Sequence, residues 1–139
     1  MRLMQTEFSI QTRGTGLYDF TSEVGRWAPS GTTGLLTLFV RHTSCSLLIQ
    51  ENADPDVQRD LQAYFHRLVP PADDPSMSYL SHTVEGPDDM PAHIKAAMMP
   101  VSLSIPVTDG RPALGTWQGI YLFEHRQAPH TRRVAAHLG

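Results

Sequence analysis

Residues 34–49 read GLLTLFVRHTSCSLLI, and this stretch decides the fold class. From Gly34 to Val40 the residues are nearly all apolar or β-branched, which is typical of a strand covered on both faces. A second β segment follows from Cys45 to Ile49. The polar residues 41–44 between the two segments therefore follow directly after a buried strand.

Period-two patterns predict further strands on both sides of this stretch. Polar and apolar residues alternate over 4–11 and again over 101–108. The second of these runs ends at Asp109-Gly110, a strong signal for a hairpin turn. Two more strands are expected at roughly 116–125 and 131–138.

Helix signals occur at three places. A short helix from about residue 21 to Trp27 is expected to be capped by Thr21 or Ser22. A longer helix is predicted from Pro55 to about Leu68, because Asp54 is a good N-cap and proline suits the first helical position. Its apolar residues repeat at helical spacing and should pack on the sheet: Val57, Leu61, Tyr64 and Leu68.

A third helix is predicted to begin near Pro91 and to end before Pro100. Its buried side should carry Ile94, Ala97 and Met98. Because strands outnumber helices and several strands form sequential hairpins, the fold class is α+β. The expected architecture is an antiparallel β-sandwich with flanking helices, in one domain over residues 1–139.

Composition excludes several classes of function. The formal charge is −3, which argues against nonspecific binding to nucleic acid. No apolar run approaches the length of a membrane span, and the first residues lack the apolar core of a signal peptide. The single cysteine, Cys45, cannot form an intrachain disulfide and is interpreted as a small buried hydrophobe. A cytoplasmic location is therefore expected.

Polar residues gather where predicted strands end or helices begin, and such positions can converge on one pocket. The histidines match neither the HExxH helix of metalloproteases nor any zinc motif with paired cysteines. Any metal site must therefore be assembled from distant segments, and each histidine taken alone fits a structural role as well. Solvation and the helix dipole are sufficient reasons for Asp88 and Asp89, and N-capping is sufficient for Asp54.

Three long segments resemble the YjbQ-like family, also described as secondary thiamine-phosphate synthases. They are HTSCSLLIQENADPDVQRDL (His42 to Leu61), HTVEGPDDMPAHIKA (His82 to Ala96) and LGTWQGIYLFEHR (Leu114 to Arg126). The resemblance covers nearly the whole chain. It implies an antiparallel β-sandwich assembled as a homotrimer, with sites near the subunit boundaries, and the modest apolar share of 40% agrees with such an assembly.

The resemblance also implies a set of site residues. The family's recurring histidines correspond to His42, His82 and His93, which are expected to bind a divalent metal ion. The residues expected to act in catalysis are His82 and two other recurring polar residues, Glu85 and Lys95. The remaining recurring polar residues are expected to bind the substrate: Ser44, Asn52, Asp54, Thr116 and Gln118. Zinc suits three imidazoles, whereas magnesium would prefer carboxylates and phosphate oxygens.

The activity that the resemblance implies is a transferase reaction, thiamine-phosphate synthesis. A pyrimidine diphosphate is joined to a thiazole phosphate with release of pyrophosphate, so the expected ligand is a small phosphorylated molecule. A metal ion, Lys95 and backbone N–H groups would stabilise the leaving group. Two alternatives use the same residues: a metal-dependent hydrolase with Glu85 as base, and a module that binds a small anion without turnover.

Overall fold

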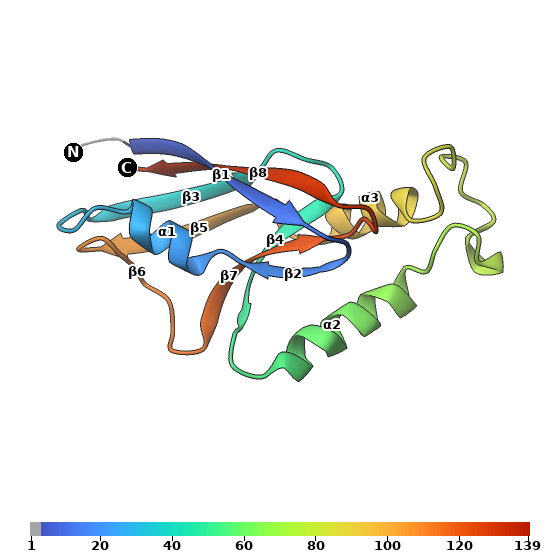
Figure 1. The fold of residues 1–139 in the computed structure, drawn as a ribbon, viewed down its shortest axis with the longest axis horizontal. Helices are drawn as coiled ribbons and strands as arrows, with labels where there is room; N and C mark the ends of the chain where they lie inside the picture. Colours follow the sequence, from blue (N-terminus) through green and yellow to red (C-terminus); the bar gives the residue numbers. More distant parts are fainter. Residues whose placement is uncertain (1–3) are drawn as a thin grey trace.

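The computed structural model describes residues 4–139, which form two antiparallel sheets and three α-helices (Figure 1). The larger sheet has the order β1-β8-β3-β5-β6, with strands β1 (Met4–Thr12), β8 (His130–Leu138), β3 (Gly34–Val40), β5 (Ser102–Thr108) and β6 (Arg111–Pro112). The smaller sheet has the order β2-β7-β4, with strands β2 (Gly16–Asp19), β7 (Gln118–Glu124) and β4 (Cys45–Glu51). The predicted α+β class is confirmed.

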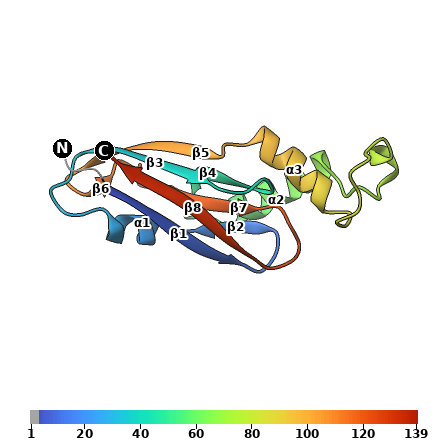
Figure 2. The same ribbon diagram turned by 90° about the horizontal axis from the view of Figure 1, so that it is seen from above.

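The helices are α1 (Thr21–Trp27), α2 (Pro55–Leu68) and α3 (Asp89–Met98), and a short 3-10 turn, η1 (Pro75–Met77), precedes α3. Buried side chains from both sheets contact one another and α1 in a single core, which includes Phe20, Leu38, Leu47, Leu122 and Val134. In Figure 2, α3 and the segment before it extend beyond the strands. No helix in the part of the chain that the structure describes is long and apolar enough to cross a membrane.

The strand predictions are confirmed in most places. Strand β1 alternates between half-buried and exposed residues, as the period-two pattern indicates. The hairpin between β5 and β6 turns at Asp109 and Gly110, whose φ angles of 53° and 74° are those of a type I′ turn. A side chain at Gly110 would also collide with the carbonyl of Pro29. Strand β2 was not predicted, because its four residues are too few for a periodic pattern.

The expectation that β3 is covered on both faces is wrong. Leu36, Leu38 and Val40 are buried, but Leu35 and Phe39 on the opposite face are 44% and 50% exposed. The neighbouring strands β5 and β8 pair with the edges of β3, and within the described residues no second layer lies over this outer face. The apolar run of β3 therefore forms a strand whose outer face is left uncovered by the rest of the same chain.

The predicted caps of α1 are also wrong, although its residues are helical. Thr21 is the first helical residue rather than a cap, and its backbone N–H donates to Asp19 Oδ1 at 2.9 Å. The Thr21 hydroxyl instead accepts a hydrogen bond from the backbone N–H of Ile120 at 2.8 Å. Thr21 therefore ties α1 to β7, and the N-cap position is Phe20, which has no side-chain cap; the Asp19 carboxylate accepts from the first N–H of the helix instead.

Helix α2 has the predicted bounds, and Asp54 caps it by accepting from the backbone N–H of Asp56 at 2.9 Å. Its packing differs from the prediction. Tyr64 and Leu68 are exposed, and Phe65 makes the contact with the sheet, at a ring distance of 5.9 Å from Phe123. No side chain of α2 is fully buried, so much of its apolar side faces solvent.

Helix α3 is rotated relative to the prediction. Met98 and Ala97 are exposed, whereas Ala92, Lys95 and Ala96 are buried. The cause lies at the start of the helix, where the buried Asp89 forms an ion pair with Arg126. That contact fixes which side of α3 faces the protein, and it places a lysine on the buried side.

A buried ion pair joins the two sheets at one end. Arg132 on β8 donates from Nε to Glu124 Oε1 at 2.7 Å and from Nη2 to Glu124 Oε2 at 2.5 Å. The Thr12 hydroxyl also donates to Glu124 at 2.7 Å, and Arg132 Nη2 donates to Ser44 Oγ at 2.8 Å. Burial raises the pKa of Glu124, but the hydrogen bonds from Arg132 and Thr12 outweigh it and lower the pKa overall.

We predict that Arg132→Met lowers the free energy of unfolding by roughly 3–5 kcal/mol, because Glu124 would remain buried without its counter-charge. Urea denaturation followed by circular dichroism measures this change. The matched control is the double variant Arg132→Met with Glu124→Gln, which should recover part of the loss since no unpaired charge is left. A single variant within about 0.5 kcal/mol of the wild type, the range of an ordinary surface substitution, would contradict the structural role of the pair.

Candidate functional site

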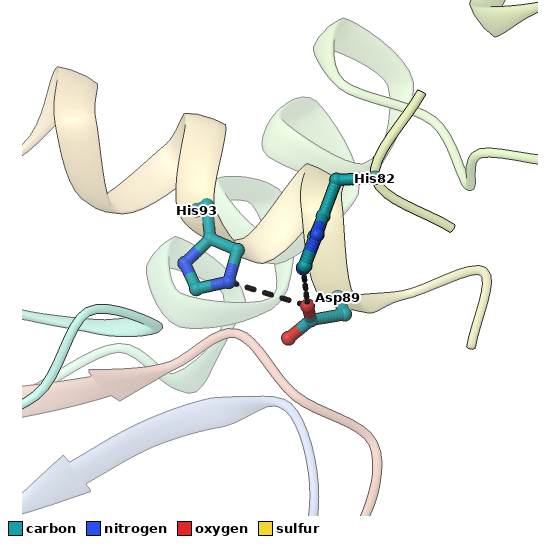
Figure 3. A group of neighbouring side chains, drawn as sticks. All are labelled: His82, Asp89 and His93. Atoms are coloured by element: carbon teal, nitrogen blue, oxygen red, sulfur yellow. Dashed lines mark hydrogen bonds and ion pairs between the residues drawn. The ribbon is translucent and has the colours of Figure 1, made fainter. Parts of the chain in front are cut away.

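Two histidines and an aspartate form a compact cluster at the start of α3 (Figure 3). Asp89 and His93 lie one turn apart on the same side of α3, and His82 comes from the loop between η1 and α3. Asp89 Oδ2 lies 2.8 Å from His82 Nε2 and 3.2 Å from His93 Nε2. One ligand atom from each residue lies within 4.8 Å of the others, which is the spacing of a metal site.

Asp89 is held in place by Arg126. The guanidinium donates from Nη1 to Asp89 Oδ1 at 2.8 Å, from Nε to Asp88 Oδ2 at 2.8 Å and from Nη2 to the carbonyl oxygen of Glu85 at 3.1 Å. Burial raises the pKa of Asp89, yet the hydrogen bond from His82 and the charges of His93 and Arg126 lower it overall. Asp89 is therefore an ionised carboxylate whose second oxygen points to the histidines.

His93 is oriented from its other ring nitrogen. Its Nδ1 lies 2.9 Å from the carbonyl oxygen of Thr43, and a carbonyl oxygen only accepts, so Nδ1 carries the proton. In the neutral ring the lone pair is then on Nε2, facing the Asp89 oxygen. Two lone pairs at that distance repel each other, so either a second proton or a metal ion between them stabilises the arrangement.

The buried pair between the sheets supports both of these contacts. The backbone N–H of Arg126 donates to Glu124 Oε2 at 3.1 Å, which fixes the residue that holds Asp89. Arg132 donates to the Ser44 hydroxyl, next to the Thr43 carbonyl that orients His93. Both supports of the cluster therefore originate in the rigid strand ends.

His42 does not join His82 and His93 in the cluster. Its Nε2 accepts a hydrogen bond from the backbone N–H of Arg133 at 2.8 Å, which occupies the lone pair that a metal would need. Burial is the main cause that lowers the pKa of His42. The carboxylate of Asp89 stands where the third imidazole was expected.

The two other predicted catalytic residues lie on different sides of the cluster. Glu85 is exposed, and its Oε2 lies 3.9 Å from His82 Nε2, so it borders the cluster. Lys95 is buried on the inner side of α3 and lines a separate cavity with His125. Burial lowers the pKa of Lys95, against the opposing effect of the Asp88 charge.

The predicted substrate-binding residues divide into two groups. Ser44 belongs to the buried network of Arg132 and lies near the cluster. The other four lie at the opposite end of the smaller sheet, where β4 pairs with the start of β7: Asn52, Asp54, Thr116 and Gln118. Glu124 is six residues along β7 from Gln118, about 20 Å at the usual strand rise. Within one chain these four residues therefore lie away from the histidines.

Sequence reasoning missed Asp89, Arg126 and the pair of Glu124 with Arg132 as parts of the site. One signal was available: Asp89 stands four residues before His93, and because α3 begins at Asp89 rather than near Pro91 as predicted, the two share a face of the helix. The roles of Arg126 and Arg132 had no such signal. Arg126 contacts Asp89 across 37 positions and Arg132 contacts Ser44 across 88, so only the folded chain brings them together.

The fold and the site define an α+β protein of two antiparallel sheets with a cluster of two histidines and a carboxylate at one end of the strands. The chain belongs to the family described as UPF0047 protein YjbQ-like, whose model matches residues 6–139. The resemblance to this family is therefore confirmed.

Similar proteins come from bacteria and archaea. A UPF0047 protein of Synechocystis is 52% identical over 93% of this chain and 86% of its own length. YjbQ of Escherichia coli O157:H7 is 40% identical over 96% of each chain. The crystal structure of the conserved hypothetical protein TT1486 from Thermus thermophilus has a TM-score of 0.83 and 34% identity over 96% of this chain and 99% of that one.

The expected thiamine-phosphate synthase function is wrong on these findings. The matching family and the relatives at 52% and 40% identity bear only the family description, UPF0047 or YjbQ-like, with no synthase or transferase activity. The family match therefore supports the fold. The function has to be argued from the site itself.

We predict that stability falls between about pH 6.5 and pH 5 because of His125, which burial keeps neutral with a pKa lowered to about 3. In this range the unfolded chain binds a proton that the folded chain does not, so the free energy of unfolding decreases as the pH falls. The contribution approaches ~1.4 kcal/mol per pH unit. Urea denaturation at several pH values measures the slope.

The control variants are His125→Gln, which should flatten the slope, and His137→Gln, which should leave it unchanged. Gln can still bond to the Ser46 hydroxyl that His125 contacts at 2.9 Å, whereas His137 lies on β8 and bonds to Gln5. Equal slopes for the wild type and His125→Gln would show that His125 is not the group responsible.

Proposed function

We propose that the protein binds a divalent metal ion at His82, Asp89 and His93, and that this metal centre takes a small phosphorylated ligand at an open coordination position. The observation that carries the proposal is the convergence of two imidazole nitrogens on one carboxylate oxygen, at 2.8 and 3.2 Å. This cluster serves no evident purpose in packing, since both histidines are partly exposed while the carboxylate is buried.

The donor set favours zinc over magnesium. Two imidazoles with one carboxylate are a common ligand set for zinc, whereas magnesium prefers oxygen ligands in an octahedral arrangement. The supporting contacts also fit zinc. His93 donates a hydrogen bond from Nδ1 to the carbonyl oxygen of Thr43, and Arg126 holds Asp89. Such outer contacts fix the orientation of metal ligands and tune the affinity.

Three protein ligands leave room for a further one. A bound zinc ion would polarise an oxygen of the ligand or of a water molecule in that position. The protein's own groups bind and orient: Arg126 keeps Asp89 ionised, and Glu85, 3.9 Å from His82, can accept a proton at its carboxylate. This proposal replaces the three-histidine site with a site of two histidines and Asp89.

We also propose that the two sheets pack as a β-sandwich and that the chain assembles as a cytoplasmic homotrimer. The shared core supports the first point. The open outer face of β3, with Leu35 and Phe39, supports assembly, since such an apolar face is costly to leave in water. The buried free thiol of Cys45, whose pKa burial raises to about 12, agrees with a reducing compartment.

We predict that His82→Ala weakens zinc binding by more than about 100-fold, whereas His42→Ala changes it by less than about 3-fold. Loss of a ligand should cost more than the 10–100-fold typical of losing an outer contact, and His42 is engaged by the Arg133 backbone. Calorimetric zinc titration of the metal-free protein, with elemental analysis, measures both. Equal losses in the two variants would restore the three-histidine site, and unchanged binding in His82→Ala would exclude both sites.

For the assembly we predict a trimer mass by light scattering at micromolar concentration and dissociation in Phe39→Glu. A charge on an apolar face buried between subunits is costly, so the variant should weaken association by at least about 100-fold, or roughly 3 kcal/mol. Tyr79→Glu is the matched control, because Tyr79 is exposed but lies in the loop after η1. A monomer mass for the wild type would refute the assembly.

A further inference from the structure

A second polar cavity lies on the inner side of α3, away from His93. It has a volume of about 170 Å³ and is enclosed by the end of α2, the inner side of α3, the loop after β7 and the turn before β2. The polar residues that line it are Thr15, His66, Asp88, Lys95, His125 and Gln127. A single water needs only about 10–15 Å³, so the cavity has room for a larger molecule.

Lys95 brings a positive charge into this cavity without a matching negative one. Its side chain is only 9% exposed, and among the described residues no carboxylate lies within ion-pair distance of it. The ammonium nitrogen is not among the fully buried atoms without a partner, so it meets the space of the cavity, where a counter-charge is favourable. Lys95 therefore supplies a charge for which the chain itself provides no partner in the cavity.

The carboxylates nearest to Lys95 are already engaged. Asp88 lines the cavity, but its Oδ2 accepts from Arg126 Nε at 2.8 Å and from the backbone N–H of Gln127 at 2.9 Å. Glu124, which borders a smaller adjoining cavity, is neutralised by Arg132. Each of these two carboxylates thus has an arginine partner, and neither forms an ion pair with Lys95.

His125 adds an unpaired ring nitrogen on the same wall. Its Nδ1 is buried and is the one side-chain polar atom, among those the structure describes as buried, that has no hydrogen-bond partner. Its Nε2 lies 2.9 Å from the Ser46 hydroxyl, which can donate to it and leave the proton on Nδ1. In that tautomer Nδ1 is a buried N–H without an acceptor, which costs about 1–3 kcal/mol and favours a ligand that accepts from it.

We propose that this cavity binds a small tetrahedral oxyanion, such as a phosphate group, between Lys95, His125 and His66. The ammonium provides the charge, and the imidazoles and the Thr15 hydroxyl are donors that approach from other elements of the fold. Donors arranged on several sides suit a tetrahedral oxyanion better than a planar carboxylate. The proposal is independent of the metal centre, because none of the three metal ligands lines this cavity.

The test is calorimetric titration of the purified protein with inorganic phosphate near pH 7, together with acetate. Phosphate should bind to the wild type with a millimolar or lower dissociation constant, and acetate at least about 10-fold more weakly. Lys95→Met should weaken phosphate binding by at least about 10-fold, since hydrogen bonds to charged groups contribute roughly that much. His125→Gln should weaken it in the same direction.

Two controls separate this site from the metal centre and from misfolding. With metal removed from both proteins, His82→Ala should bind phosphate as the wild type does, because the metal centre is then empty in each. Lys95→Met should keep the melting temperature of the wild type or exceed it without phosphate, because an unpaired buried charge has been removed. The proposal is overturned if the wild type does not bind phosphate, if Lys95→Met binds it equally well, or if acetate binds as tightly.

Discussion

The bidentate ion pair between Glu124 and Arg132 is the constraint on which the rest of the structure depends. It lies where β7 of the smaller sheet and β8 of the larger sheet come together, and it is almost wholly buried. An ion pair in such a place requires every remaining lone pair to be satisfied, and here Thr12, Ser44 and the backbone of Arg126 complete the network. The same groups also support the histidine cluster at the start of α3.

Two supports lead from that pair to the histidine cluster. One passes through Arg126, which is held by Glu124 and in turn holds Asp89. The other passes through Ser44 to its neighbour Thr43, whose carbonyl sets the orientation of His93. The cluster is therefore built on strand ends and the first turns of a helix, and only His82 comes from a loop. Such a foundation limits how far the ligand atoms can move apart.

Local sequence signals predicted most of the helices and strands, but not which side of each one faces the core. Alternation over β1, the Asp-Gly turn and the Asp54 cap each depend on a few neighbouring residues, and each was predictable. The rotation of α3 depends on the contact of Asp89 with Arg126, far along the chain. For that reason Lys95, which was expected among the catalytic residues, lies on the buried side of α3, whereas Met98, which was expected in the core, is exposed. His42 was expected in the metal site from the family resemblance, whereas Asp89 was explained by solvation and the helix dipole alone.

The position of Arg126 has a thermodynamic consequence. Its guanidinium forms ion pairs with two successive carboxylates. Asp89 lies on the side of the histidine cluster, and Asp88 lies on the side of the lysine cavity. A cation at the histidine cluster and an anion in the lysine cavity would polarise the guanidinium of Arg126 in the same direction. The two ligands would then show positive heterotropic cooperativity, and each would raise the affinity for the other by the same factor, as linkage requires.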